Sequence, residues 1–200
     1  MRVVLLLVGA YLCGSLPVGV WVGRRMGVDV RVAGSGNIGA TNVARTAGRG
    51  AGLLTLLGDV AKGVLPAALA RLLLVNPWLV AVTGLAAVGG HLFSIFLRFS
   101  GGKGVATAFG VFVVLTPAAA GLSALVFAVT AFSTHYVSLA SVLATLTLPL
   151  AVVACGYHAP LSIAAGVVTV SVILRHRDNL SRLRRGVEPR FRVGRRASAQ

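Results

Sequence analysis

Three long stretches without any charged side chain constrain the fold of this chain more than any other feature. They cover residues 3–23, 72–97 and 104–174. A helix crosses the hydrocarbon core of a bilayer in about 20 apolar residues, so the third stretch alone has room for several crossings. With 56% hydrophobic and 12% charged residues and a mean hydropathy of +0.89, the chain is expected to be an all-α polytopic membrane protein. We expect residues 1–200 to form a single membrane-integral domain.

The positions of the basic residues predict which helix ends share one side of the membrane. Of the 19 Lys and Arg residues, only Arg2, Lys62 and Arg71 lie outside three clusters. Because cytoplasmic segments carry an excess of Lys and Arg, we place all three clusters in the cytoplasm. The clusters consist of Arg24, Arg25, Arg31, Arg45 and Arg49, then Arg98 and Lys103, then Arg175, Arg177, Arg182, Arg184, Arg185, Arg190, Arg192, Arg195 and Arg196.

This charge pattern predicts about seven transmembrane helices, with the N-terminus outside and the C-terminus cytoplasmic. The stretch 104–174 must cross an even number of times for the tail to rejoin the other clusters. The first span is expected to be retained, because its apolar run to Val22 is longer than that of a signal peptide. The expected spans are 3–23, 51–73 and 78–97, followed by breaks at Thr116-Pro117, 133–138 and 156–160. The short helices this leaves at 104–116 and 160–174 either cross fully or are re-entrant.

The polar segments between these spans are expected on the cytoplasmic side. They comprise loops at 24–50, 98–104 and 133–138 and a basic tail at 175–200. The tail suits contact with anionic lipid headgroups. Its arginines do not alternate with aromatic residues on a soluble surface, so the net charge of +15 does not indicate nucleic-acid binding.

Two glycine-rich polar segments have the composition of phosphate-binding loops. Residues 34–45 combine three glycines that permit close approach of the backbone with several side-chain donors and Arg45. Residues 101–107 place Lys103 just before an apolar helix, so that an ammonium group and a helix N-terminus would face one anion. An ordinary flexible loop would also be rich in Gly, Ser and Asn, but such loops rarely add so many donors and an arginine.

Other phosphate and acyl-transfer motifs do not fit. Residues 34–39 match GxGxxG, yet the alternating strands and helices of a dinucleotide-binding fold are missing. Lys103 is followed by Gly104, whereas a P-loop needs Ser or Thr there. No His is followed by Asp at the fifth position, so the pair with which common glycerolipid acyltransferases deprotonate their acceptor is absent. Four acidic residues are too few to indicate a metal site.

Asp59 and Lys62 place two opposite charges within an apolar span. They are three residues apart and therefore share one face of a helix. Charges at that depth pair with one another or line a polar cavity. The alternative is an ion pair near the cytoplasmic end that lets the helix begin in water.

Four segments in order resemble the bacterial PlsY family of acyl-phosphate:glycerol-3-phosphate acyltransferases. They are SGNIGATNVAR (35–45), HLFSIFLRFSGGKGVAT (91–107), SLAS (138–141) and RHRDNLSRLRRGVE (175–188). The likeness covers nearly the whole chain. Two positions depart from the usual family pattern, with Ser94 where Pro is usual and Ser100 where Lys is usual.

The resemblance implies a multi-pass enzyme of the bacterial cytoplasmic membrane whose site faces the cytoplasm. It would transfer a fatty acyl group from acyl phosphate to the 1-hydroxyl of sn-glycerol 3-phosphate. The products would be lysophosphatidic acid and inorganic phosphate, in the first step of phospholipid synthesis. No metal or other cofactor is implied, and the lipid bilayer is the only further partner of a monomer.

The resemblance also assigns roles to individual residues. Arg45 and Lys103 would carry the catalysis by charge and alignment. The acyl phosphate would be bound by Ser35, Gly36, Asn37, Gly39, Ala40 and Thr41. Glycerol 3-phosphate would be bound by Arg45, Lys103, Ser141, His176 and Asn179. Further candidates in the same segments are Asn42, His91, Gly101, Gly102, Gly104 and Thr107.

A small transporter for an anion such as phosphate is the alternative from another class. Short broken helices, a basic cytoplasmic face and glycine-rich segments would serve it too. Against it, both glycine-rich segments are expected on one side of the membrane, and no inverted repeat relates the two halves of the chain. Residues and resemblance together favour the enzyme.

Overall fold

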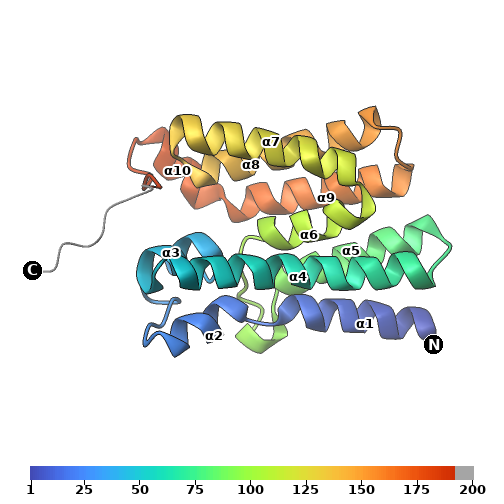
Figure 1. Cartoon of the computed structure of the whole chain (residues 1–200), viewed down its shortest axis with the longest axis horizontal. Coiled ribbons are helices and arrows are strands. Elements are labelled where there is room, and N and C mark those ends of the chain that lie inside the picture. Colours follow the sequence, from blue (N-terminus) through green and yellow to red (C-terminus); the bar gives the residue numbers. More distant parts are fainter. Residues whose placement is uncertain (192–200) are drawn as a thin grey trace, which may run out of the picture.

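The computed structural model describes residues 1–191, and within them it contains helices and no strand. The helices are α1 (Arg2–Ser15), α2 (Val18–Arg25), α3 (Ala40–Ala47), α4 (Arg49–Leu73), α5 (Pro77–Leu92), the 3-10 turn η1 (Ile95–Leu97), α6 (Val105–Leu115), α7 (Pro117–Thr134), α8 (Val137–Ala154), α9 (Ala159–Arg175) and α10 (Arg177–Arg184). Figure 1 shows the long helices side by side along one axis, with the N-terminus at one end of the bundle and α10 at the other.

The expectation of a helical membrane protein is confirmed, but the count of seven spans is not. Within residues 1–191, five helical segments are long and apolar enough to cross a membrane, or six if α9 and α10, which meet at 57°, count as one. The first of them is α1 together with α2. Helix α6 has 11 residues and is only about 17 Å long at 1.5 Å per residue, so it is too short to cross alone.

The breaks predicted in the last apolar stretch are present. Helix α7 begins at Pro117, which has no backbone N–H and suits the first turn of a helix. The predicted loop at 133–138 shrinks to His135 and Tyr136, and the break near 156–160 separates α8 from α9. The predicted loop at 24–50 is not irregular throughout, because it contains α3 and the first residues of α4.

The first span is broken at Leu16 and Pro17, and two distant side chains satisfy the carbonyls that this break exposes. The Ser94 hydroxyl donates to the Ser15 carbonyl at 2.6 Å, and Lys62 Nζ donates to the Leu16 carbonyl at 2.8 Å. Backbone groups at membrane depth need partners within the protein, so these contacts stabilise the break. Ser94, one of the two departures from the family pattern, therefore anchors α1 to the segment after α5.

Helices α4 and α6 approach closely because glycines face one another at their contact. A Cβ atom on Gly63 would overlap the backbone of Thr107, and one on Gly110 would overlap the backbone of Val60. Small residues of this kind let membrane helices pack at short distance. The short helix α6 is thereby held deep in the bundle, where Phe112 is fully buried.

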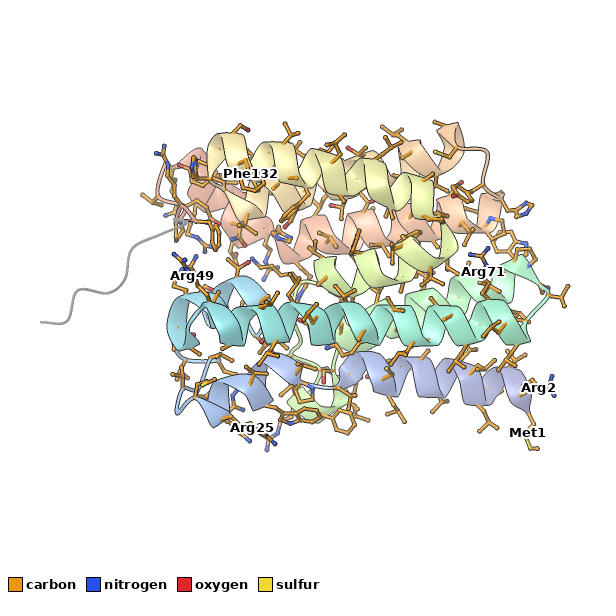
Figure 2. All side chains as sticks on the ribbon, viewed as in Figure 1. Met1, Arg2, Arg25, Arg49, Arg71 and Phe132 are labelled. Atoms are coloured by element: carbon orange, nitrogen blue, oxygen red, sulfur yellow. The ribbon has the colours of Figure 1, made fainter. Side chains whose placement is uncertain are left out.

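The two ends of the bundle differ in their charge. Figure 2 shows Arg25 and Arg49 at the end that also carries α10, and Arg2 and Arg71 at the opposite end. Arg25 and Arg49 of the first cluster therefore lie at the same end as α10, which carries part of the third cluster, as the charge pattern predicts. Arg192, Arg195 and Arg196 of the basic tail lie outside the described residues.

The glycine contact between α4 and α6 predicts the effect of adding a single methyl group. Gly110→Ala should lower the free energy of unfolding by about 1–3 kcal/mol, because the methyl group has no space in the packed contact. Gly121→Ala in α7 is the matched control, since a Cβ there meets nothing within 4 Å. It should be neutral or stabilise by about 0.5–1 kcal/mol. Thermal unfolding in detergent measures both, and equal midpoints for the two variants would contradict the close approach.

Candidate functional site

A cavity of about 700 Å³ opens between α3, α4, α6, α7, α8 and the turn that joins α9 to α10. It brings together ten of the eleven residues predicted to bind the two substrates, although they come from four separate segments of the chain. These ten are Ser35, Asn37, Gly39, Ala40, Thr41, Arg45, Lys103, Ser141, His176 and Asn179. Gly36 does not line the cavity.

Asn42 holds the first glycine-rich loop in shape. Its Oδ1 atom accepts from the Ser35 N–H at 2.9 Å, and its Nδ2 atom lies 2.9–3.0 Å from the carbonyl oxygens of Val30, Ala33 and Asn37. The side chain is 2% exposed. Both amide hydrogens are used inside the protein, which gives Asn42 a role in shaping the loop. Asn42 also lines the cavity, and its contact with substrate stays a prediction.

The loop turns sharply at Gly34 and Gly36, where φ is +61° and +70°. These left-handed conformations favour glycine, and a Cβ on Gly34 would also collide with Asn42 Oδ1. Gly36 thus serves the turn and not the cavity wall.

After the turns, the chain enters α3 with Gly39 as its N-cap, and the Gly39 N–H donates to Asn37 Oδ1 at 2.7 Å. The backbone N–H groups of Ala40 and Thr41 have no partner within residues 1–191, which leaves two donors beside the cavity.

The second glycine-rich loop is clamped from both sides. The N–H groups of Gly101 and Gly102 donate to the carbonyls of Leu92 and His91, at 3.2 and 3.0 Å. From the other side, Arg175 Nε donates to the Gly102 carbonyl at 3.0 Å. These two glycines do not line the cavity, so their predicted contact with substrate is replaced by a role in holding Lys103.

Beyond Lys103, the chain turns at Gly104, whose φ is +83°, and enters α6 at Val105. The predicted helix start after Lys103 is therefore confirmed, and Gly104 lines the cavity. Thr107 is buried within the contact with α4, and its hydroxyl reaches neither the cavity nor a partner within residues 1–191.

Lys103 begins a chain of polar contacts that crosses the mouth of the cavity. Its Nζ atom donates to Asn179 Oδ1, and Asn179 Nδ2 donates to Glu188 Oε1 at 2.6 Å. Arg182 Nε donates to the other carboxylate oxygen of Glu188 at 2.7 Å. Burial lowers the pKa of Lys103 from 10.5 to about 8, more than the nearby Glu188 carboxylate raises it. The ammonium group is thus poised to gain an anionic partner.

Three further polar side chains surround this contact chain. His176 is 2% exposed, and its Nδ1 atom donates to the Val172 carbonyl at 2.8 Å, so in the neutral ring Nε2 is an acceptor. Ser141 is also buried, and its hydroxyl donates to the Val137 carbonyl at 2.8 Å. The Arg45 side chain is exposed at the mouth and has no hydrogen-bond partner within residues 1–191.

The charges within the membrane span pair with one another, as one interpretation of the sequence predicts. Lys62 Nζ lies 2.8 Å from Asp59 Oδ1 and 3.1 Å from His91 Nδ1, and all three side chains are 3–4% exposed. Asp59 and His91 also line the cavity. Asp59 therefore both pairs with Lys62 and lines the cavity.

The inner part of the cavity is apolar. Its wall is formed by side chains of α6, α7 and α8, namely Phe109, Phe112, Ala120, Ala124, Phe127, Ala144 and Leu148. A cavity that is cationic and rich in donors at its mouth and apolar inside suits an anionic headgroup with a hydrocarbon chain.

Sequence reasoning missed two residues at the mouth. Arg182 and Glu188 line the cavity, whereas the sequence alone predicts that the tail containing them contacts lipid headgroups. Both lie in the segment 175–188, which carries the family resemblance. The signal was a pair of carboxylates, Asp178 and Glu188, among the five arginines of this segment, a composition that favours ion pairs once the tail folds back.

Fold and site together describe a membrane-integral helical protein whose cavity is cationic at its mouth and apolar inside. The family model described as "Glycerol-3-phosphate acyltransferase" matches residues 4–186. A glycerol-3-phosphate acyltransferase of Geobacter sulfurreducens is 50% identical over 92% of this chain and 95% of its own length. One of Geotalea daltonii is 45% identical over 94% and 97%.

Solved structures agree with these relatives. PlsY, described as an integral membrane glycerol 3-phosphate acyltransferase, superposes with a TM-score of 0.92 in its glycerol 3-phosphate form, at 41% identity over 96% of both chains. Its lysophosphatidic acid form gives a TM-score of 0.90 at 40% identity. The chain belongs to the glycerol-3-phosphate acyltransferase family and is an acyltransferase, which decides against the anion transporter.

Proposed function

We propose that this enzyme transfers the acyl group of an acyl phosphate to the 1-hydroxyl of glycerol 3-phosphate, giving lysophosphatidic acid and inorganic phosphate. One observation carries the proposal. A single cavity joins two separate sets of hydrogen-bond donors and cations to one apolar wall. Two anionic headgroups and one hydrocarbon chain are what this reaction has to bring together.

The first loop is assigned to the phosphate of the donor. The unpartnered N–H groups of Ala40 and Thr41 lie at the N-terminus of α3, where the helix dipole also favours negative charge. The Ser35 side chain and Asn37 complete the group around it. The acyl chain then extends along the apolar wall of α6, α7 and α8.

The contact chain at the mouth is assigned to glycerol 3-phosphate. Lys103 and Arg45 neutralise its phosphate, while Ser141 and Asn179 supply hydrogen bonds. His176 Nε2 accepts from a hydroxyl of glycerol and orients it toward the donor. One chain supplies the whole group, which supports a monomer as the active form.

The reaction requires no covalent enzyme intermediate, because an acyl phosphate has a good leaving group. The 1-hydroxyl oxygen attacks the acyl carbon, the carbonyl electron pair moves to oxygen, and the tetrahedral oxyanion collapses with release of phosphate. The departing phosphate takes the hydroxyl proton. Catalysis is then alignment together with electrostatic stabilisation.

The role of Lys103 predicts a loss of affinity at high pH. Below about pH 8 the ammonium group is charged; above it the free enzyme loses this charge, and phosphate binding must take up a proton. The substrate phosphate stays dianionic from pH 7.5 to 9.5, since its second pKa is about 6. The dissociation constant for glycerol 3-phosphate should therefore rise up to about tenfold per pH unit above 8.

Two variants separate the charge of Lys103 from its other contacts. Lys103→Arg stays charged throughout this range and should flatten the pH dependence. Lys103→Ala should lower kcat/KM by about 30- to 5000-fold, the equivalent of about 2–5 kcal/mol for an anion left without its partner. Calorimetric binding at each pH measures the first effect and steady-state kinetics the second. A pH profile of the unsubstituted enzyme that matches Lys103→Arg would contradict the assignment.

The donor is predicted to be acyl phosphate and not acyl-CoA. No His-x4-Asp pair is present, and neither glycine-rich loop has a residue pattern typical of an adenine or pantetheine site. Purified enzyme in lipid should form lysophosphatidic acid from palmitoyl phosphate and glycerol 3-phosphate. Comparable turnover with palmitoyl-CoA, in a system free of acyl phosphate, would refute the proposed donor.

We place the cavity mouth and α10 on the cytoplasmic side of the bacterial inner membrane, with the N-terminus outside, because the basic clusters gather there. The variants Arg184→Cys and Asn76→Cys, each in a chain whose Cys13 and Cys155 have been replaced, test this orientation. An impermeant maleimide added to intact cells should label position 76 and leave position 184 unlabelled until the membrane is opened. Labelling with the reverse pattern would invert the topology.

A further inference from the structure

We propose that His91 donates a hydrogen bond from Nε2 to the carbonyl oxygen of the acyl donor and stabilises the oxyanion that forms on it. This inference rests on the proposed function, because it needs an acyl phosphate in the cavity. The groups described above bind the two phosphates, and none of them is assigned to the negative charge that develops on the acyl carbonyl oxygen. The inference assigns His91 to this oxyanion. Lys62 is the positioning residue that gives His91 this capacity.

The hydrogen bonds of Lys62 determine where the ring proton of His91 lies. Its ammonium group has three N–H bonds, and the structure supplies three acceptors, at Leu16 O, Asp59 Oδ1 and His91 Nδ1. An ammonium group donates and cannot accept, so His91 Nδ1 must offer its lone pair. The ring proton of neutral His91 is therefore on Nε2.

This Nε2–H group is left for a ligand. Within residues 1–191 it has no hydrogen-bond partner, although the side chain is 4% exposed and lines the cavity. Its edge of the ring faces Gly102, where a Cβ atom would collide with Nε2. Gly102 thus leaves room for the ring beside Lys103. Nε2 is not among the fully buried atoms without a partner, so it stays accessible to a ligand.

His91 lies at the depth in the bundle where the carbonyl of a bound acyl phosphate is expected, just below the donor phosphate. The first loop meets α4 at Thr55, since the space at Gly19 is filled by both the Ile38 carbonyl and the Thr55 side chain. Asp59 follows Thr55 by four residues, about one helical turn or 6 Å deeper in the bundle. The pair of Asp59 and His91 therefore lies one turn below the donor phosphate, on the side where the acyl chain enters the apolar part.

A donor at this point has a defined chemical task. Attack by the glycerol hydroxyl forms a C–O bond and moves the carbonyl π pair onto oxygen, and the bond to phosphate then breaks as the carbonyl re-forms. Arg45, Lys103 and the α3 N-terminus serve the phosphates. The Nε2–H group of His91 serves the transient oxyanion, where a preorganised donor in a dry site is most effective.

A spectroscopic experiment tests the contact without turnover. The probe is a palmitoyl phosphonate with a methylene group in place of the bridging oxygen and a carbon-13 label at the carbonyl. Its bound carbonyl should stretch at lower frequency in the unsubstituted enzyme than in His91→Phe. Lys62→Met should weaken this shift, because His91 Nδ1 can then donate to Asp59, which lies 3.7 Å away. His158→Phe, at an exposed residue outside the cavity, is the control and should keep the full shift.

Steady-state kinetics on the same variants distinguish His91 as a hydrogen-bond donor from His91 as a general base. His91→Phe should lower kcat about 10²- to 10³-fold, the usual effect of removing one oxyanion donor, with little change in KM for glycerol 3-phosphate. His91→Gln keeps an N–H donor and should recover much of this loss. A folded His91→Gln that binds both ligands and is as inactive as His91→Phe would show a base and overturn the proposal.

The remaining outcomes are equally decisive. An unshifted carbonyl in the unsubstituted enzyme, or a kcat of His91→Phe close to that of His158→Phe, would remove the proposed role of His91 and leave the donor assignment intact. Failure of the phosphonate to bind the unsubstituted enzyme would remove the proposed donor itself. Unfolding midpoints of all variants identify any that fail to fold, and the carbonyl frequency in His91→Gln then decides the contact.

Discussion

Polar groups placed at membrane depth need partners inside the protein, and most of the architecture around the cavity follows from this constraint. The break between α1 and α2 exposes carbonyls, and these are met by Lys62 from α4 and Ser94 from the segment after α5. Lys62 in turn needs Asp59 and His91. The break in the first span is thus connected through a buried ion pair to the wall of the cavity. These contacts fix the positions of the first span, α4 and α5 relative to one another.

In both glycine-rich loops, one set of groups holds the loop in shape and another set faces the cavity. Asn42 uses its whole amide to hold the first loop, and the backbone of His91 and Leu92 together with Arg175 holds the second. The groups left over, the N–H groups that begin α3 and the Lys103 ammonium, are those that face the cavity. A loop whose own hydrogen bonds are complete can present its remaining donors to a ligand without reorganising, which is the basis of electrostatic preorganisation.

The sequence predicted the class of fold and most of the cavity wall, because both depend on local composition. Apolar stretches identify spans, and glycine with Ser, Asn and Arg identifies a phosphate loop before any contact is known. The sequence did not predict which polar side chains would form hydrogen bonds within the protein and so be unavailable to a ligand. Asn42 resembles Ser35 and Asn37 in the sequence, and only the path of the loop turns it inward. Nor could it show that Glu188 returns to Asn179, because this contact depends on the turn that follows α10 at Arg185 and Gly186.

The distribution of carboxylates within residues 1–191 bears on where the acceptor proton goes. Asp29 is paired with Arg31 on the surface, Asp59 with Lys62, and Glu188 with Asn179 and Arg182. Asp178 is exposed beside Arg177 and does not line the cavity. Each carboxylate in the cavity wall thus already has a cation or a donor as its partner, and accepting a proton would cost it that contact. In the reaction that we propose, the basic group best placed to receive the proton is the phosphate of the acyl phosphate, since its basicity rises as the bond to the acyl carbon breaks. On this proposal, the cationic site acts at both stages of the reaction, because it would hold two anions together and then stabilise the phosphate that leaves.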